Sequence, residues 1–208
     1  YIGDSLRELK YMIKTILSTA PISIQVKTLT LLSSIYKNYP KALAKYNTEI
    51  TDKLFEIKNQ ESLISNIFNV FKYMLKSIDN QLVKKVFNHI EKTLSDLTLE
   101  KVTLKPLYEF AKTATTIIDK DTLKEILKNY SKKIKELNEN INYFVSILIS
   151  GSGEEKKYLD LCLSLLNSTK DDKQIINILL LIGNISENSQ QKNDDIINKL
   201  EKLKSKIS

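Results

Sequence analysis

The chain has 208 residues, is 42% hydrophobic and 27% charged, and carries a formal net charge of +7. Its four Gly and three Pro are too few for an all-β protein, which needs a turn signal about every 8–12 residues. A single cysteine, Cys162, excludes a disulfide framework and a zinc site made of cysteines, and it points to a reducing compartment, the cytoplasm or the nucleus. A single histidine, His89, excludes most hydrolase and metal sites.

The positive charge consists almost entirely of lysine, since Arg7 is the only arginine among 32 basic residues. Arginine binds phosphates and bases bidentately, whereas lysine is a hydrated point charge. Asn (17) and Ile (27) are abundant together with Lys, which indicates a coding bias. The densest lysine groups, Lys84-Lys85 and Lys132-Lys133-Lys135, fall on the polar sides of predicted helices. We interpret them as solvated helix faces, with a phosphate-binding patch as the alternative.

Apolar residues recur at the spacing of an amphipathic helix along almost the whole chain. Residues 95–103 interrupt this rhythm and predict a longer connection. Pro106 is expected in the first turn of the helix that follows, where its missing N–H costs nothing. Asp121 or Thr122 is expected to cap the next helix. In chain order, the stripes predict eleven helices at residues 6–17, 26–36, 46–57, 64–75, 82–94, 106–118, 123–137, 141–148, 158–166, 175–185 and 196–207.

A helix starts about every 19 residues, so a pair of helices takes about 38 residues. This length lies between tetratricopeptide repeats, of about 34 residues, and HEAT or armadillo repeats, of about 40–47 residues. The tetratricopeptide pattern of Trp, Gly and Tyr is absent. The sequence therefore predicts an all-α fold, an α-solenoid of antiparallel helix pairs of the HEAT or armadillo type. A compact bundle, which usually has fewer and longer helices, is the alternative.

Residues 1–208 are expected to form a single HEAT-like segment, with 95–103 and 150–153 as candidate points of subdivision. The chain does not begin with Met, and the last predicted helix carries an apolar seam along one side. Both features favour a fragment of a longer solenoid. The longest apolar run, 175–185, is interrupted by polar residues and is shorter than the roughly 20 residues that span a bilayer. We therefore expect no contact with a membrane.

Four local features invite a chemical interpretation, and a structural role explains each of them better. Gly151-Ser152-Gly153 lacks the further residues of a phosphate-binding loop and predicts a linker. Cys162 lies in an apolar helix, which favours a buried, unreactive thiol. His89 has no partners for a metal, which favours a structural or surface role. Acidic pairs stand where predicted helices begin and complement the helix dipole: Glu154-Glu155, Asp171-Asp172 and Asp194-Asp195.

These interpretations leave no catalytic, cofactor-binding or metal-binding residue, so we expect a protein that is not an enzyme and has no cofactor and no small-molecule substrate. Most of the ten Tyr and six Phe lie within the apolar stripes and are expected in the core. Tyr11, Tyr39 and Tyr73 fall outside the stripes and are candidate exposed anchors for a partner.

Three stretches, in order along the chain, carry a resemblance. Leu29–Lys45 (LTLLSSIYKNYPKALAK) has the form of a second HEAT helix that ends in Tyr-Pro. Tyr108–Lys112 has the form Tyr-x-x-Ala-Lys, and Leu166–Ser186 contains a Leu-rich run that ends in a turn at Gly183. Together they resemble the later half of the cullin-associated, neddylation-dissociated family, over about residues 26–186.

This resemblance implies a large HEAT solenoid that binds an unmodified cullin and its RING partner, and so exchanges the substrate-receptor modules of cullin–RING ubiquitin ligases. It assigns no contact residue in this chain. Another HEAT scaffold, such as a nuclear-transport karyopherin or a condensin-type subunit, is an alternative within the class of protein-binding scaffolds. A nucleic-acid-binding helical repeat, suggested by the net charge of +7, is the less favoured alternative.

Overall fold

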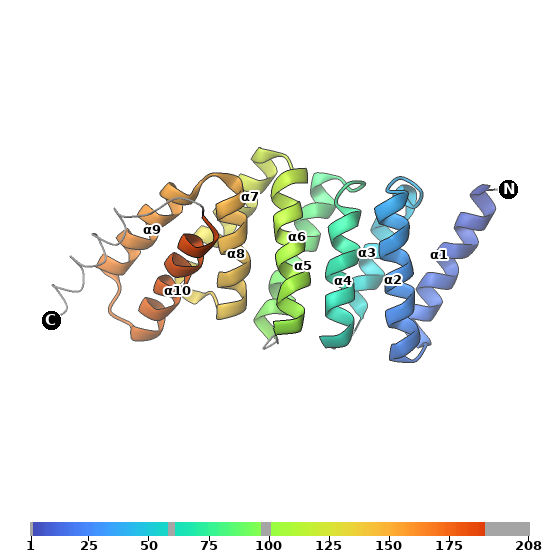
Figure 1. Cartoon of the computed structure of the whole chain (residues 1–208), viewed down its shortest axis with the longest axis horizontal. Coiled ribbons are helices and arrows are strands. Elements are labelled where there is room, and N and C mark those ends of the chain that lie inside the picture. The colour runs from blue at the N-terminus through green and yellow to red at the C-terminus, as the bar shows by residue number, and fades with distance from the viewer. Residues whose placement is uncertain (1, 58–60, 97–100, 190–208) are drawn as a thin grey trace. The chain divides into compact units, whose positions relative to one another are not determined.

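The described residues, which are 2–57, 61–96 and 101–189 in the computed structural model, form α-helices joined by short connections (Figure 1). These ranges contain no strand, so the expected all-α class is confirmed for them. Short 3₁₀ turns at Ala44–Tyr46 and Ile134–Glu136 join some of the helices. The α-helices are α1 Ile2–Thr19, α2 Ile22–Asn38, α3 Asn47–Glu56, α4 Glu61–Met74, α5 Asn80–Asp96, α6 Lys101–Ile117, α7 Lys120–Ser131, α8 Glu139–Ser152, α9 Glu155–Ser168 and α10 Asp172–Asn188.

Ten of the eleven expected helices fall in the described ranges, and the stripe at 196–207 lies outside them. The expected place of Pro106 is wrong, because α6 starts at Lys101 and Pro106 lies inside the helix, where its missing N–H leaves one intrahelical bond unmade. The predicted helix over 123–137 is too long, since α7 ends at Ser131. Its stripe continues because Ile134, in the 3₁₀ turn, is also buried.

The chain divides into two compact units, residues 1–118 and 119–208. The division lies between the two candidate points of subdivision, 95–103 and 150–153. The longer connection expected over 95–103 is wrong at both ends, because α5 continues to Asp96 and α6 begins at Lys101. Each unit has its own buried side chains, so the packing of each can be described by itself.

In the first unit, each helix packs against the helix two places along the chain. The helices α2, α4 and α6 form one row, with α4 in contact with both of the others (Figure 1). The helices α1, α3 and α5 are linked in the same way, with α3 in the middle. An amphipathic helix cannot bury its apolar face alone, so this arrangement gives each inner helix two neighbours in its own row.

Aromatic rings fill the space between the two rows of the first unit. Phe55 of α3 lies 6.0 Å from Phe71 of α4, measured between ring centroids, and Phe87 of α5 lies 5.5 Å from Phe110 of α6. Burying a large apolar side chain stabilises a fold by about 1.5–3 kcal/mol. The fully buried side chains of this core also include Tyr36, Phe68, Leu29, Leu32, Leu43, Ile50 and Leu54.

The second unit is built around α8, which contacts α7, α9 and α10. Eight consecutive or nearly consecutive side chains of α8 are buried, from Ile141 to Ile149. The Asn142 side chain donates to the carbonyl of Asn177 in α10 at 3.1 Å. Gly153 ends α8 with φ of +74°, a conformation that side chains with a Cβ rarely adopt.

Asn47 is the buried polar residue that joins α2, α3 and the turn after α4. Its carbonyl oxygen accepts from the Tyr36 hydroxyl at 2.8 Å, and its amide nitrogen donates to the Ser77 carbonyl at 2.6 Å. Burial raises the pKa of Tyr36, so its hydroxyl keeps its proton and remains a donor. These bonds satisfy polar groups that would otherwise be buried without partners.

Replacing Asn47 by alanine should therefore destabilise the protein. Asn47→Ala strands the Tyr36 hydroxyl and the Ser77 carbonyl, and we expect a loss of about 2–3 kcal/mol in the free energy of unfolding, measured by urea denaturation. Asn38→Ala is the matched control, because Asn38 is exposed and bonds only within its own helix, and it should cost less than about 0.5 kcal/mol. Equal losses for the two variants would contradict this account of the core.

Candidate functional site

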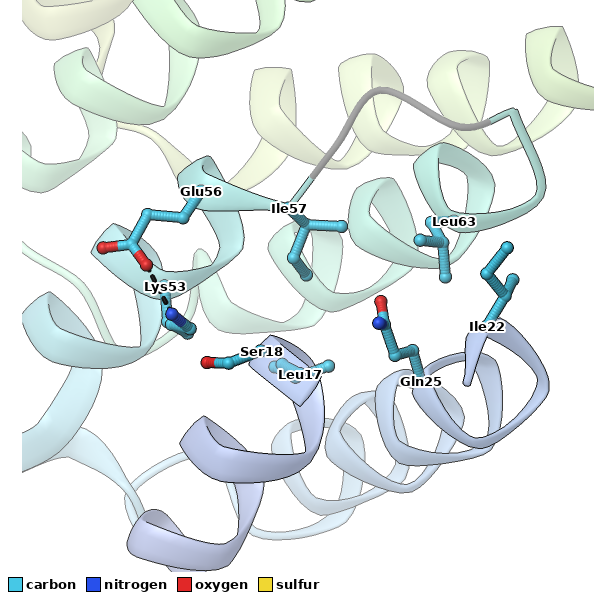
Figure 2. A pocket seen from close by; sticks show the side chains of 8 residues that line it. All are labelled: Leu17, Ser18, Ile22, Gln25, Lys53, Glu56, Ile57 and Leu63. Atoms are coloured by element: carbon cyan, nitrogen blue, oxygen red, sulfur yellow. Dashed lines mark hydrogen bonds and ion pairs between the residues drawn. The ribbon is translucent and has the colours of Figure 1, made fainter. Parts of the chain in front are cut away.

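A pocket of about 320 Å³ opens in the first unit where α1 and α3 end and α2 and α4 begin. Figure 2 shows apolar side chains and the Gln25 amide facing the hollow, with Lys53 and Glu56 at one side. The Lys53 ammonium pairs with the Glu56 carboxylate, and Gln25 donates to the carbonyl of Ala20 at 2.8 Å. The pocket is lined by Leu17, Ser18, Ile22, Gln25, Lys53, Glu56, Ile57 and Leu63.

The polar groups of this pocket already have partners. Lys53 and Glu56 form an ion pair, and Gln25 and Ser18 donate to backbone carbonyls of their own segment. The remaining surface is formed by Leu17, Ile57 and Leu63, which are buried, and by the half-exposed Ile22. The hollow therefore combines a paired, polar side with an apolar side, and it brings together no group of residues typical of a reactive site.

The described residues contain no group of three or more His, Cys, Asp and Glu side chains that could hold a metal ion. Within the same ranges, no helix is long and apolar enough to cross a bilayer.

His89 of α5 is packed against aromatic rings of two other helices. Its imidazole stacks on Phe55 of α3 with centroids 4.2 Å apart, and the edge-to-face contact with Phe71 of α4 is 6.4 Å. Burial, and to a lesser extent the charge of Lys92, lowers the pKa of His89 to about 4. The imidazole is therefore neutral at neutral pH, and the structural role expected for it agrees with these contacts.

The lowered pKa of His89 makes the stability of the fold depend on pH. An unfolded chain protonates this histidine near its ordinary pKa of 6.5, whereas the folded chain resists protonation down to about 4. The contribution of His89 is therefore complete above about pH 6.5 and is lost as the pH falls towards about 4. The measurement is the thermal midpoint of the protein and of His89→Phe, each at about pH 7 and about pH 5. Between these two pH values, the midpoint of the unsubstituted protein should decrease more than that of His89→Phe. Parallel decreases would contradict the proposed linkage.

Cys162 is fully buried in α9, as expected from its apolar surroundings. Burial raises the pKa of its thiol to about 12, so the reactive thiolate is scarce at neutral pH.

The thiol should accordingly be protected by the fold. We expect Cys162 to react with Ellman's reagent at least about a hundredfold more slowly in the native protein than in urea, because the native thiol is both protonated and covered. The measurement is the rate of absorbance change with and without denaturant. If the native protein reacted at a rate near that of the unfolded chain, the packing around α9 would not cover the thiol.

The other features singled out in the sequence are the acidic pairs, the expected cap of α7 and the expected linker after α8. Asp171 caps α10 by accepting from the amide of Gln174 at 2.8 Å, and Glu154 precedes α9, whereas Asp194-Asp195 lies outside the described residues. The cap of α7 is Asp119 rather than Asp121 or Thr122. The linker predicted at Gly151-Ser152-Gly153 is wrong for its first two residues, because α8 continues to Ser152 and only Gly153 lies beyond it. 

The two dense lysine groups differ in their surroundings. Lys84-Lys85 lies on α5, as expected. Lys132-Lys133-Lys135 does not lie on a helix face, because α7 ends at Ser131 and these residues occupy the turns that follow. The ammonium of Lys133 lies 5.4 Å from the ring of Tyr130.

Of the three candidate tyrosine anchors, two are exposed. Tyr11 is 73% and Tyr39 is 69% exposed, as expected. Tyr73 of α4 is half-buried. The ammonium groups of Lys37 and Lys72 lie 5.9 and 4.6 Å from its ring centroid. At these distances an ammonium is attracted to the negative face of the ring.

This tyrosine belongs to a chain of contacts that crosses α2, α4 and α6. Lys37 of α2 lies over Tyr73 of α4, Lys72 of α4 pairs with Glu109 of α6 at 2.6 Å, and Lys112 of α6 lies 5.9 Å from the ring of Tyr108. We call this group the lysine–tyrosine ladder; its members are Lys37, Lys72, Tyr73, Tyr108, Glu109 and Lys112. The sequence alone did not reveal it, because its members are separated by one repeat length.

Both members of the central pair of the ladder, Lys72 and Glu109, have pKa values that favour the charged form. Burial opposes the charge of Lys72, but hydrogen bonds to Glu109 and Tyr73 raise its pKa above the usual value. The hydrogen bond from Lys72, helped by the charges of Lys72 and Lys105, lowers the pKa of Glu109. The side chain of Lys72 is 11% exposed and that of Glu109 is 41% exposed. The pair is therefore ionised at neutral pH and ties α4 to α6.

Charge is distributed unequally between the two rows of the first unit. The helices α2, α4 and α6 together contain six lysines and two glutamates, a net charge of +4. The helices α1, α3 and α5 contain seven basic and seven acidic residues. Within the first unit, the positive charge is therefore concentrated on the row that carries the ladder.

The sequence matches no protein-family model and no curated protein, and no solved structure matches the fold. What the chain does must therefore be inferred from its own packing and surfaces.

Proposed function

We propose that this chain is a protein-binding scaffold of the helical-repeat class, a HEAT- or armadillo-like α-solenoid segment. The observation that carries the proposal is an offset of 35–42 residues, about one repeat, between residues that bond across neighbouring helices of a row. In the first unit, Thr30 and Asn66 are 36 residues apart, and Lys72 and Glu109 are 37 residues apart. In the second unit, Asn142 bonds the Asn177 carbonyl 35 residues away.

This offset is the length of one repeat. If helices two places apart pack in a fixed register, a residue and its counterpart in the next pair bond at a separation of about one repeat, here close to the 38 residues estimated from the helix starts. The Ser150 hydroxyl, 35 residues from the carbonyl of Ile185 that it contacts at 3.5 Å, follows the same rule. A bundle gives no reason for one offset to recur in both units.

Exposed apolar side chains support a role in binding proteins. Tyr11 and Met12 on α1 are 73% and 58% exposed, and Leu31 on α2 is 53% exposed. Large apolar side chains held in the open on rigid helices are typical anchors of protein interfaces. Further exposed apolar residues are Ile22, Ile24, Tyr39, Ile176, Leu179 and Leu180.

The partner we propose is a cullin–RING pair, on the strength of the resemblance over Leu29–Lys45, Tyr108–Lys112 and Leu166–Ser186. These stretches correspond to the second half of α2 and the turn after it, to part of α6, and to the end of α9 with α10. The turn expected at Gly183 is wrong, because Gly183 lies inside α10. A regulator of cullin–RING ligases acts by exchanging their substrate-receptor modules, without chemistry of its own. Such a role places the protein in the cytoplasm or the nucleus.

The cullin proposal predicts direct binding to purified components. The protein, immobilised for interferometry, should bind an unmodified recombinant cullin–RING pair with a dissociation constant of about 1 μM or tighter, which corresponds to about 8 kcal/mol. The same pair carrying the ubiquitin-like modifier is the matched control and should bind at least about tenfold more weakly. No binding of the unmodified pair at concentrations of about 20 μM would reject the cullin as partner.

A further inference from the structure

We propose that the lysine–tyrosine ladder is a docking surface for an acidic segment of a partner protein. The inference deepens the proposed function, since it rests on the chain being a protein-binding scaffold and names the chemistry of one thing it binds. It is carried by the ladder's contacts, by the exposure of its outer lysines, and by the charge of the row on which it lies.

The ladder faces outward while the opposite sides of its helices form the core. On α6, Lys105, Glu109 and Lys112 are spaced i, i+4 and i+7 and share one face of the helix. Lys105 and Lys112 are exposed. The buried residues of α6 lie on the other face, and they are Leu107, Phe110, Ala111 and Ala114.

The two outer lysines of the ladder lie beside tyrosine rings and remain exposed. The Lys37 ammonium lies 5.9 Å from the Tyr73 ring centroid, and the Lys112 ammonium lies 5.9 Å from the Tyr108 ring centroid. This distance is at the outer limit of the attraction between an ammonium and a ring. Both ammonium groups are therefore open to a carboxylate of a partner.

The row offers a partner a surplus of positive charge. α2 contains no acidic residue, and on α6 the one glutamate, Glu109, is bound to Lys72. An incoming carboxylate therefore meets Lys37 on one side of the central pair and Lys105 and Lys112 on the other. Complementary charge of this kind sets specificity and speeds association.

The geometry favours an extended peptide. Packed helices lie roughly 8–10 Å apart, so the path from α2 across α4 to α6 is roughly 16–20 Å, or about six residues of extended chain. The exposed Tyr39, directly after α2, adds an apolar contact at the start of that path. A short acidic segment with an apolar residue at one end matches this surface.

A nucleic acid fits the ladder less well. Single strands bind by stacking bases on open aromatic faces, but lysine ammonium groups already lie over the rings of Tyr73 and Tyr108. The three helices also contain no arginine, the residue that holds phosphate bidentately.

Charge reversal at the two ends of the ladder tests the proposal. The probe is a fluorescein-labelled peptide of about twelve residues, Glu and Ser in alternation with one Leu at its amino end, and binding is followed by anisotropy. The variant Lys37→Glu/Lys112→Glu should weaken binding at least about tenfold. The control, Lys85→Glu/Lys92→Glu, changes the net charge equally but on α5, where both lysines are exposed, and should weaken it less than about threefold.

Several outcomes would overturn the inference. Equal weakening by the two variants would show that only net charge matters. Tighter binding of an oligothymidylate of about twelve nucleotides, lost in the same variant, would assign the ladder to nucleic acid. Circular dichroism checks that each variant folds, and the milder Lys37→Gln/Lys112→Gln, expected to weaken peptide binding at least about threefold, replaces the reversal if it does not.

The same variants separate this inference from the proposed function. If the peptide binds and the cullin–RING pair does not, the cullin is rejected and the ladder stands. In another outcome, the cullin–RING pair binds the protein, but the two double variants bind the pair equally well and bind the peptide equally well. The ladder is then rejected as a docking surface, and the proposed scaffold function stands.

Discussion

The structure depends on the packing of alternate helices against one another, α2 with α4, α4 with α6, and α8 with α10. An amphipathic helix buries its apolar face only against neighbours, so each of these contacts covers surface that would otherwise face water. In the first unit α4 lies between α2 and α6, and its side chains Phe68, Phe71 and Met74 are buried almost completely. Remove that neighbour relationship and the largest side chains of the unit would face water.

Polar contacts add to apolar packing in fixing the register of one helix on the next. In the first unit, Thr30 bonds Asn66 and Lys72 bonds Glu109, about one repeat further along the chain. In the second unit, Asn142 bonds the carbonyl of Asn177. Lys72 and Asn142 are buried, so a shift by one residue would take a buried polar group away from this partner. The register then determines which surface residues meet, and the ladder is one result.

The helices and much of the core could be predicted from the spacing of apolar residues, because burial follows the 3.6-residue period directly. The stripe that contains Ile64, Phe71 and Leu75 is buried as that period requires. Boundaries were predicted less well. Asp119 rather than Asp121 caps α7, because acidic residues occur on both sides of the true start and both suit the first turn. The prediction for Pro106 was wrong because proline is common in the first turn of a helix but also occurs further inside one, as it does in α6.

The surface could not be predicted in the same way. Nothing local marks Lys37 as the neighbour of Tyr73, or Lys72 as the partner of Glu109, since each pair is joined only through the stacking of helices. Tyr73 was recognised as lying outside the apolar stripe, but two lysines cover the ring that was expected to be open. The unequal charge of the two rows likewise becomes visible only when the helices are sorted into rows.

Glu109 shows how stability and recognition meet on this row. Its carboxylate neutralises Lys72, which is nearly buried and would otherwise place an unpaired charge at the α4–α6 boundary. The same pairing consumes the row's central cation and leaves the outer lysines for a partner. A scaffold that used every lysine internally would hold its helices together but offer no charge. A scaffold that paired no lysine internally would leave the charge of Lys72 without a partner. The packing of α4 on α6 therefore determines that the central lysine is paired and that the outer lysines stay available.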